Sequence, residues 1–296
     1  MSRAKVHIFD SHVYIFRAYY SLPPMVSPSG KPTSAAYGFA NTLLKYIFDE
    51  EPSYLVCCFD AAATSFRNEI FPEYKASRLE PPADLEPQFE ICRLLAKALG
   101  IPCFEVENFE ADDLIATLTD RVLTEGGEVR IVSSDKDLAQ LITEDGRSEL
   151  FDLARDTLLD ANGVRNKFGV SPAQIPDYLG LAGDAVDELP GVPGIGSKGA
   201  AAALSAFGAL EDFPESLNEW ETVPFRGPRK LGERFLKHRG QAFKMRRLAT
   251  VVRDVPALSE ISIQDLTYKG AREAEVGDLF EELGWGDITT RIRHWA

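Results

Sequence analysis

Long apolar stretches are absent from this chain. Nowhere do the roughly 18 consecutive apolar residues that a membrane-spanning helix needs occur, and the first ten residues lack the apolar core of a signal peptide. Cysteine is also scarce: four occur in 296 residues, with no Cys-x-x-Cys spacing, which argues against a zinc site or a disulfide framework. We interpret the cysteines as small core residues and expect a globular, cytoplasmic protein that binds no membrane.

Positive charge is in short supply. The chain has 32 Lys and Arg against 46 Asp and Glu, a net charge of −14, which by itself argues against a nucleic-acid partner. Residues 226–247 are the exception, with nine Lys and Arg and the single acid Glu233. This segment is either a solvated helix face or a basic track for a phosphate backbone.

Acidic residues, by contrast, gather in five short clusters. Three clusters directly follow runs of apolar or β-branched residues at 6–9, 54–59 and 129–134, which are typical of buried strands. Long helical patterns separate these runs and predict a parallel α/β sheet, in which ligands bind at the carboxyl ends of the strands. The clusters are Asp10; Asp60; Glu110, Asp112 and Asp113; Asp135 and Asp137; and Asp184 and Asp187.

Nine carboxylates in one cleft would repel each other unless cations lay between them. All the candidate ligands are oxygen donors, which suit Mg²⁺, with Mn²⁺ as a substitute, better than Zn²⁺. For Glu110, Asp112 and Asp113 an ordinary alternative exists, because acidic residues commonly begin helices. Agreement among the clusters favours a site for two or more metal ions.

The segment after Asp60 combines cations with aromatic side chains. Arg67, Lys75 and Arg78 alternate with Phe71 and Tyr74 in a stretch too long for a simple crossover loop. Such a combination suits gripping phosphates and stacking on bases, although a solvated loop has the same composition.

A glycine-rich segment at 191–200 has three interpretations. Gly194, Gly196 and Gly199 match the dinucleotide-binding pattern, but the preceding residues 172–189 are expected to be helical rather than a strand. A phosphate-binding P-loop requires Lys before Ser or Thr, whereas Ser197 here precedes Lys198. We favour a turn between two helices that grips a DNA backbone, against an ordinary helical hairpin, because Asp184 and Asp187 directly precede it.

The motifs occur in the order found in the 5′ nucleases. The chain resembles this family, which contains the 5′ nuclease domain of bacterial DNA polymerase I, phage 5′ exonucleases and flap endonucleases. The resemblance covers about residues 5–256. It rests on Asp10 with the tyrosines at 14–20, Phe59-Asp60, Phe66-Arg67, Tyr74-Lys75-Ala76-x-Arg78, Glu110-Ala-Asp-Asp113, Ser134-Asp-Lys-Asp-Leu138, the text at 181–198, and Leu248-Ala-Thr250.

The resemblance implies a fold and an activity. The expected fold is an α/β, parallel-sheet PIN-like nuclease domain at 1–162 with a helical arch at 64–88, followed by a helical domain at 163–296 with a helix-three-turn-helix DNA-binding motif. The implied activity is that of a structure-specific 5′-3′ exonuclease and 5′ flap endonuclease in DNA replication and repair. Such an enzyme uses two divalent metals, so neither His7 nor His12 is expected to be catalytic.

The resemblance also implies roles for individual residues. Five carboxylates would hold the metals nearest the scissile phosphate, and four would complete the acidic set. Lys75 and Arg78 would contact that phosphate, and Tyr74 would stack on a terminal base. The first five are Asp10, Asp60, Glu110, Asp112 and Asp135; the other four are Asp113, Asp137, Asp184 and Asp187; and the further DNA contacts are Arg67, Gly191, Gly194, Gly196, Ser197 and Lys198.

Some positions depart from the family pattern. Ala185 and Glu188 stand where polymerase-linked relatives usually carry Ser and Asn, and Ser11 replaces a common Gly. Glu188 adds negative charge beside the glycine segment, where K⁺ would bind in the helix-three-turn-helix. With no room for a polymerase domain before Ala296, we expect a free-standing, monomeric nuclease.

The expected substrates are DNA with 5′ flaps, nicks or branched ends, and RNA-primed ends. Two alternatives stay open: a catalytically weak, structure-specific DNA-binding protein, and a PIN-like ribonuclease. The ribonuclease is disfavoured because such domains usually lack a second helical domain with a glycine hairpin.

Overall fold

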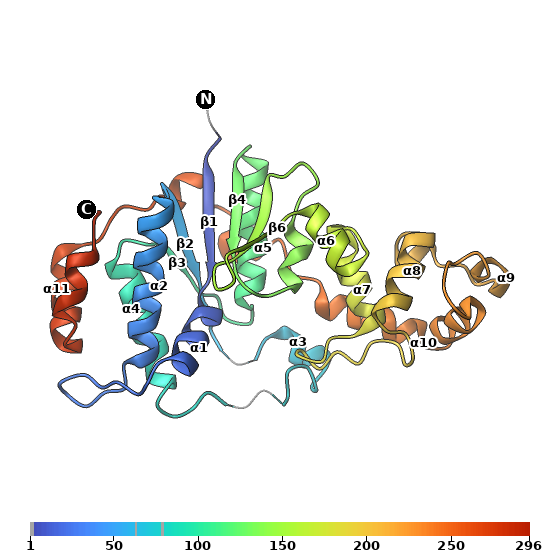
Figure 1. Ribbon diagram of the computed structural model, residues 1–296, viewed down its shortest axis with the longest axis horizontal. Coiled ribbons are helices and arrows are strands. Elements are labelled where there is room, and N and C mark those ends of the chain that lie inside the picture. The colour runs from blue at the N-terminus through green and yellow to red at the C-terminus, as the bar shows by residue number, and fades with distance from the viewer. Residues whose placement is uncertain (1–2, 63, 78–79) are drawn as a thin grey trace. The chain divides into compact units, whose positions relative to one another are not determined.

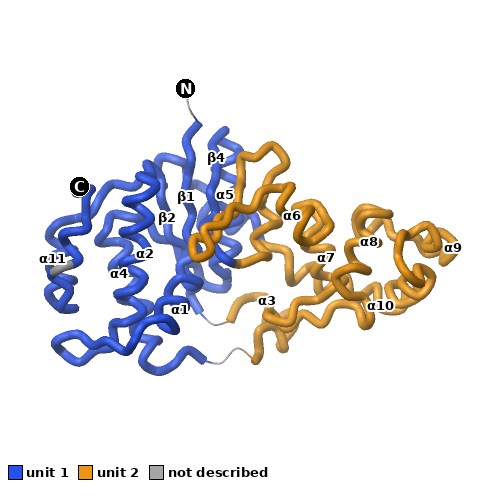
Figure 2. The backbone as a smooth tube through the Cα atoms, viewed as in Figure 1, with its two compact units in different colours: residues 1–63, 80–134, 252–296 blue, residues 64–79, 135–251 orange. Residues whose placement is uncertain are grey.

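The chain divides into two compact units (Figure 2). The structure is a computed structural model that describes residues 3–62, 64–77 and 80–296. One unit consists of residues 1–63, 80–134 and 252–296, and the other of residues 64–79 and 135–251. The boundary predicted between residues 162 and 163 lies inside the second unit. Each compact unit is therefore made of stretches that are separated along the chain.

The first unit is built on parallel strands. β1 (Lys5–Asp10) lies between β2 (Tyr54–Cys58) and β4 (Glu128–Val132), and β3 (Cys103–Phe104) pairs with β2, so the order is β3-β2-β1-β4. β1 is buried from Val6 to Asp10, as a strand covered on both faces must be, and Val6, Ile8 and Phe9 supply its apolar side chains. The predicted parallel sheet is confirmed.

Helices cover this sheet. With this strand order, the right-handed rule for parallel crossovers predicts α2 and α4 on one face of the sheet and α5 on the other. α2 and α4 pack side by side (Figure 1), and α5 contacts β1, β2 and β4. The helices of the first unit are α1 (Ser11–Ser21), α2 (Ser34–Glu50), α4 (Glu86–Ala98), α5 (Ala111–Thr124) and α11 (Glu273–Leu283), with 3₁₀ turns η4 (Pro256–Leu258), η5 (Ile263–Leu266) and η6 (Gly286–Arg291).

The C-terminal tail belongs to the first unit because backbone hydrogen bonds tie it there. The Tyr268 amide donates to the Ser53 carbonyl at 3.0 Å, and the Arg272 amide donates to the Ala98 carbonyl at 2.9 Å. These bonds hold residues 252–296 in the first unit, and the domain boundary predicted between residues 162 and 163 stays a prediction.

The second unit is mainly helical. It contains one antiparallel strand pair, β5 (Ser148–Asp152) and β6 (Thr157–Leu159). Its helices are α3 (Phe66–Ile70), α6 (Ala161–Phe168), α7 (Ile175–Ala182), α8 (Ser197–Phe207), α9 (Leu217–Trp220) and α10 (Pro228–Ala249), with 3₁₀ turns η1 (Asp137–Leu141), η2 (Pro172–Gln174) and η3 (Leu210–Asp212).

Close helix packing forms the core of this unit. Gly180 lets α7 approach α10, since a Cβ there would lie 2.7 Å from the Ala242 carbonyl oxygen. Trp220 is fully buried among Phe207, Phe213 and Phe235. The expected long helix at 172–189 is wrong in extent, because α7 ends at Ala182. Gly183 turns the chain there with a φ of +77°.

Candidate functional site

The carboxylates predicted to bind metal occur in both units. The first unit holds Asp10, Asp60, Glu110, Asp112 and Asp113, and the second holds Asp135, Asp137, Asp184 and Asp187. The prediction that all nine share one cleft therefore concerns both units and stays a prediction. We call the two groups the strand-end set and the acidic-turn set.

The sheet topology gathers the strand-end set. Asp10 is the last residue of β1, its register partner on β2 is Cys58, and its carboxylate accepts a hydrogen bond from the Ser133 hydroxyl at 2.7 Å. Burial raises the pKa of the Cys58 thiol well above its usual value, and the charges of Asp10, Asp60 and Asp112 add to this. Three of the predicted ligands thus lie within electrostatic range of one buried thiol.

Two neighbours orient Asp60. Its carboxylate accepts a hydrogen bond from the Ala111 amide at 2.7 Å, at the start of α5. Its own amide donates to Nδ1 of His12 at 3.2 Å, which makes Nδ1 an acceptor. Burial lowers the pKa of His12 despite the opposing charges of Asp60 and Glu105, so the ring is neutral. His12 therefore positions Asp60 through a hydrogen bond.

Asp113 has a structural role. It is fully buried, and its two oxygens accept hydrogen bonds from the backbone amides of Glu110 at 3.1 Å and Val252 at 2.8 Å. Each oxygen thus has an N–H donor already, and the prediction that Asp113 also binds metal stays a prediction. The carboxylate begins α5 and fixes the tail, in line with the ordinary interpretation of acids at a helix start.

In the second unit, the acidic-turn set is crowded. Asp137 is 8% exposed, and its Oδ1 has no hydrogen-bond partner. Burial raises the pKa of Asp137 to about 8, with further contributions from Asp135, Asp184 and Asp187 against the opposing charge of Lys136. An orphaned, buried carboxylate oxygen among other carboxylates is the environment that a bound cation would relieve.

Two lysines partly neutralise the negative charge of the acidic-turn set. Nζ of Lys136 lies 2.6 Å from Oδ2 of Asp184, and Nζ of Lys75 lies 3.7 Å from Oδ2 of Asp187. Burial opposes the charge on Lys136, but Asp184, Asp137 and Asp135 outweigh it and raise its pKa. The sequence analysis assigns no role to Lys136, although its position between Asp135 and Asp137 indicates a cation placed among carboxylates.

The donor chemistry fits a hard divalent cation, but the geometry is incomplete. Within the described ranges, no group of three or more Asp, Glu, His or Cys is arranged so that it could hold a metal ion. In the acidic-turn set, the ammonium groups of Lys75 and Lys136 lie against the carboxylates of Asp187 and Asp184.

Two arch residues differ from their predicted roles. Arg67 is only 2% exposed, and its guanidinium donates to the carbonyl oxygens of Leu248 at 2.9 Å and Thr250 at 3.2 Å. It anchors α3 instead of facing DNA. Tyr74 is 3% exposed, with its hydroxyl 3.3 Å from Asp187, so its ring is not open for stacking on a base. Arg78 lies outside the described residues.

The glycine segment forms a turn between α7 and α8. Gly191 is buried with a φ of +61°, and a Cβ there would lie 2.4 Å from the Gly183 nitrogen, so the turn packs closely at this residue; its predicted contact with DNA stays a prediction. Gly194, Gly196, Ser197 and Lys198 are exposed. No side chain caps the N-terminus of α8, whose first N–H groups lie beside Lys198.

Helix α10 supports this turn through two contacts that were not predicted. Arg234 donates to the Gly194 carbonyl oxygen at 2.6 Å, and Gln241 donates to the Gly191 carbonyl oxygen. Both residues lie in the basic segment 226–247. Two polar residues of that segment therefore hold the backbone of the turn through hydrogen bonds.

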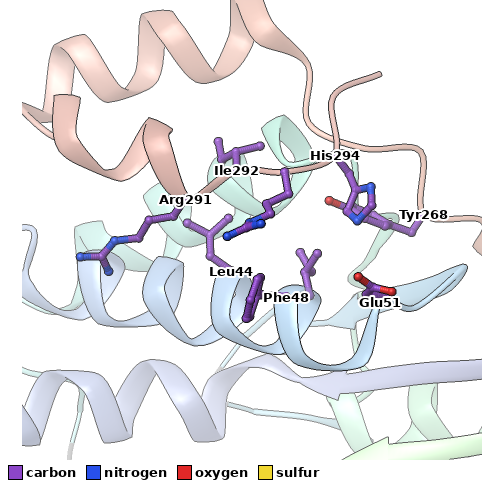
Figure 3. A pocket seen from close by; sticks show the side chains of 9 residues that line it. Leu44, Phe48, Glu51, Tyr268, Arg291, Ile292 and His294 are labelled. Carbon is purple, nitrogen blue, oxygen red and sulfur yellow. The ribbon is translucent and has the colours of Figure 1, made fainter.

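A small pocket lies elsewhere in the first unit (Figure 3). It has a volume of about 20 Å³ and is lined by α2 and the C-terminal tail, including Leu44, Phe48 and Ile292. That volume holds about one water molecule, and none of the predicted site residues lines it.

Comparisons with known proteins agree with this architecture. Residues 5–169 match the family model described as the 5′-3′ exonuclease N-terminal resolvase-like domain, and residues 170–274 match the 5′-3′ exonuclease C-terminal SAM fold. The chain is 38% identical to a 5′-3′ exonuclease of Aquifex aeolicus over 224 residues, which is 76% of each protein. It is 39% identical over 295 residues to DNA polymerase I of Bacillus caldotenax, covering 98% of this chain and 32% of that protein. The chain thus spans about a third of the polymerase relatives.

Solved structures share the fold. A phage T5 5′-exonuclease structure with bound divalent metal ions (zinc) superposes with a TM-score of 0.68 at 21% identity, covering 94% of this chain and 99% of that one. A T5 flap endonuclease structure described as a complex with DNA and metal ions has a TM-score of 0.65 at 20% identity, covering 97% and 98%. In the described part of the chain, no helix is long and apolar enough to cross a membrane.

Proposed function

Since this chain belongs to the 5′-3′ exonuclease family, we propose that it hydrolyses phosphodiester bonds near the 5′ ends of flapped, nicked or branched DNA, using Mg²⁺. Belonging to this family makes it a nuclease of the exonuclease and flap endonuclease type. The observation that carries the metal-dependent proposal is the crowding of carboxylates in both units, with an orphaned oxygen on Asp137.

Each set of carboxylates would hold metal in its own unit. In the first unit the candidate ligands are Asp10, Asp60, Glu110 and Asp112, all oxygen donors. In the second unit they are Asp135, Asp137, Asp184 and Asp187. Bound divalent ions would supply Lewis acidity that activates a water molecule and stabilises the leaving oxygen.

The protein's own residues would orient these ligands and bind the substrate. The Ser133 hydroxyl and His12 fix Asp10 and Asp60. Lys75 would add positive charge where charge develops on the phosphate, and Arg78 is proposed to act in the same way. The expected products carry a 3′-hydroxyl and a 5′-phosphate.

DNA binding is assigned to the N-terminus of α8. Its uncapped N–H groups, the exposed Gly194 and Gly196, and the side chains of Ser197 and Lys198 suit contacts to a phosphate backbone, which need no base reading. K⁺ is proposed to bind at the same turn. The protein would act as a monomer in the cytoplasm, where replication in bacteria also supplies RNA-primed ends.

The test is cleavage of a 5′-labelled DNA flap, and of the same flap in RNA, with Mg²⁺ or Mn²⁺ and with EDTA. We expect metal-dependent cutting near the junction of the DNA flap and no cutting in EDTA. Binding without cutting in either metal would favour the DNA-binding alternative, whereas preferential cutting of the RNA flap would favour the ribonuclease.

A further inference from the structure

Within the second unit, the base of the arch is fastened to the acidic turn. We use these names for residues 71–77 and 183–189. The Lys75 amide donates to the Asp187 carbonyl oxygen at 3.3 Å, and the Ser77 amide donates to Oε2 of Glu188 at 2.5 Å. The Tyr74 hydroxyl completes the contact with Oδ2 of Asp187 at 3.3 Å. Two backbone amides and a side chain of the arch thus point to two adjacent acidic residues.

The backbone on both sides of this contact is strained. Lys75 has a φ of +54° and Glu188 a φ of +56°, in the left-handed region that residues other than Gly and Asn seldom adopt. Such conformations persist where surrounding contacts fix them, and they concentrate at functional sites. The side chain of Glu188 accepts the hydrogen bond from Ser77 while its backbone holds the left-handed conformation, so this contact is one of those that fix the strained backbone.

In the same contact, the ammonium group of Lys75 is paired with the carboxylate of Asp187. Its side chain and that of Asp187 are 13% and 14% exposed, with Nζ and Oδ2 3.7 Å apart. The ammonium also lies 4.9 Å from the centre of the Tyr74 ring. While this arrangement holds, Lys75 serves as the counter-ion of Asp187.

We propose that Glu188 is a positioning residue which, with Asp187, latches the arch base to the acidic turn, and that a divalent ion binding at the turn releases Lys75. The release rests on the proposed metal-dependent function, whereas the latch itself does not. A cation beside Asp187 would replace the ammonium as its counter-ion, so metal binding and the latch oppose each other. Lys75 would then become available for the DNA phosphate.

Amide hydrogen exchange without metal or DNA tests the latch. In Glu188→Ala we expect the Ser77 amide to exchange about fivefold faster, the factor for one hydrogen bond of ordinary net strength. Glu188→Gln keeps the reach and the acceptor oxygen and is expected to exchange like the wild type. Equal exchange in Glu188→Ala and the wild type would overturn the latch.

Amine labelling read by mass spectrometry tests the release, again without DNA. Adding Mg²⁺ should speed the labelling of Lys75 and leave exposed Lys230 unchanged. In Asp187→Asn, Lys75 should label fast with or without metal. Unchanged labelling of Lys75 in wild-type protein saturated with Mg²⁺ would overturn the release.

A linked measurement separates positioning from a merely structural role. If the latch opposes metal binding, a weaker latch should let Mg²⁺ release Lys75 at a lower concentration. In Glu188→Ala, the Mg²⁺ concentration that gives half of the full increase in Lys75 labelling should fall by up to about fivefold. The same half-maximal Mg²⁺ concentration in Glu188→Ala and the wild type would contradict the coupling. Failure of the protein to bind Mg²⁺ at all would overturn both the release and the metal-dependent function, while the exchange result would still decide the latch.

Discussion

At the scale of single residues, the acidic-turn set depends on charge balance. Lys75 and Lys136 lie against Asp187 and Asp184, and Asp137 has a buried oxygen without a partner. A carboxylate in that position costs free energy when no cation is bound. The same residues should therefore govern metal binding, the stability of the metal-free protein and turnover.

Replacing Asp137 with Asn should stabilise the protein in EDTA. Because its pKa is raised to about 8, Asp137 must take up a proton on folding at neutral pH, a cost that the neutral Asn avoids, for an expected gain of about 1 to 2 kcal/mol at neutral pH and a rise in melting temperature of a few degrees. The rise that Mg²⁺ gives the wild type should shrink. Asp145→Asn is the control, because Asp145 is paired with Arg147 and lies outside the acidic-turn set. Thermal unfolding in EDTA that shows a less stable Asp137→Asn protein would contradict the crowding.

Replacing Lys75 with Ala should affect turnover more than substrate binding. A cation that stabilises developing charge is typically worth about 3 kcal/mol, or roughly a hundredfold in kcat. Single-turnover cleavage and DNA binding in Ca²⁺ measure the two effects separately, with Lys75→Arg as the charge-retaining control. Equal losses in rate and affinity would assign Lys75 to binding alone.

At the scale of elements, the turn between α7 and α8 relies on glycine. Gly183 has a φ of +77°, and a Cβ there would lie 2.4 Å from the Leu189 carbonyl oxygen. Gly191 faces it with a φ of +61°. The turn can close only because neither residue has a side chain.

Gly183→Ala should therefore cost about 2 to 4 kcal/mol, through a left-handed backbone and a clash with a carbonyl oxygen. Gly240→Ala is the matched control, since it lies within α10 with nothing within 4 Å of the added Cβ, and it should be neutral or stabilising. Urea unfolding of both variants provides the comparison. Similar stabilities would contradict the assigned role of the turn.

The N-terminus of α8 makes a second prediction at this scale. Lys198→Ala should weaken binding to any DNA sequence and lower the slope of log affinity against log salt by about 1. Lys31→Ala, which removes an exposed lysine paired with Glu282 in the first unit, should leave the slope unchanged. Fluorescence anisotropy over a series of salt concentrations distinguishes them, and identical slopes would place DNA elsewhere.

At the scale of the whole molecule, the sequence predicts local features better than long-range contacts. Strand ends at Asp10 and a helix start at Glu110 follow from periodicity and from the order of elements. The burial of Arg67 depends on the carbonyl of Leu248, 181 residues away, and Asp113 is satisfied by Val252, 139 residues away. Local patterns do not encode such partners, so the structural contacts of Arg67 and Asp113 could not be predicted from the sequence.

The central claim for the whole molecule is that both carboxylate sets hold the divalent ions that cleavage requires. The most direct measurement is Mn²⁺ binding, read from free Mn²⁺ by electron paramagnetic resonance, together with single-turnover cleavage of one DNA flap. It compares the wild type with Asp10→Asn and Asp184→Asn. We predict that each variant binds fewer ions and loses at least about a hundredfold in cleavage rate, while DNA binding in Ca²⁺ stays within a few-fold. Full cleavage by either variant with wild-type Mn²⁺ binding would contradict the account.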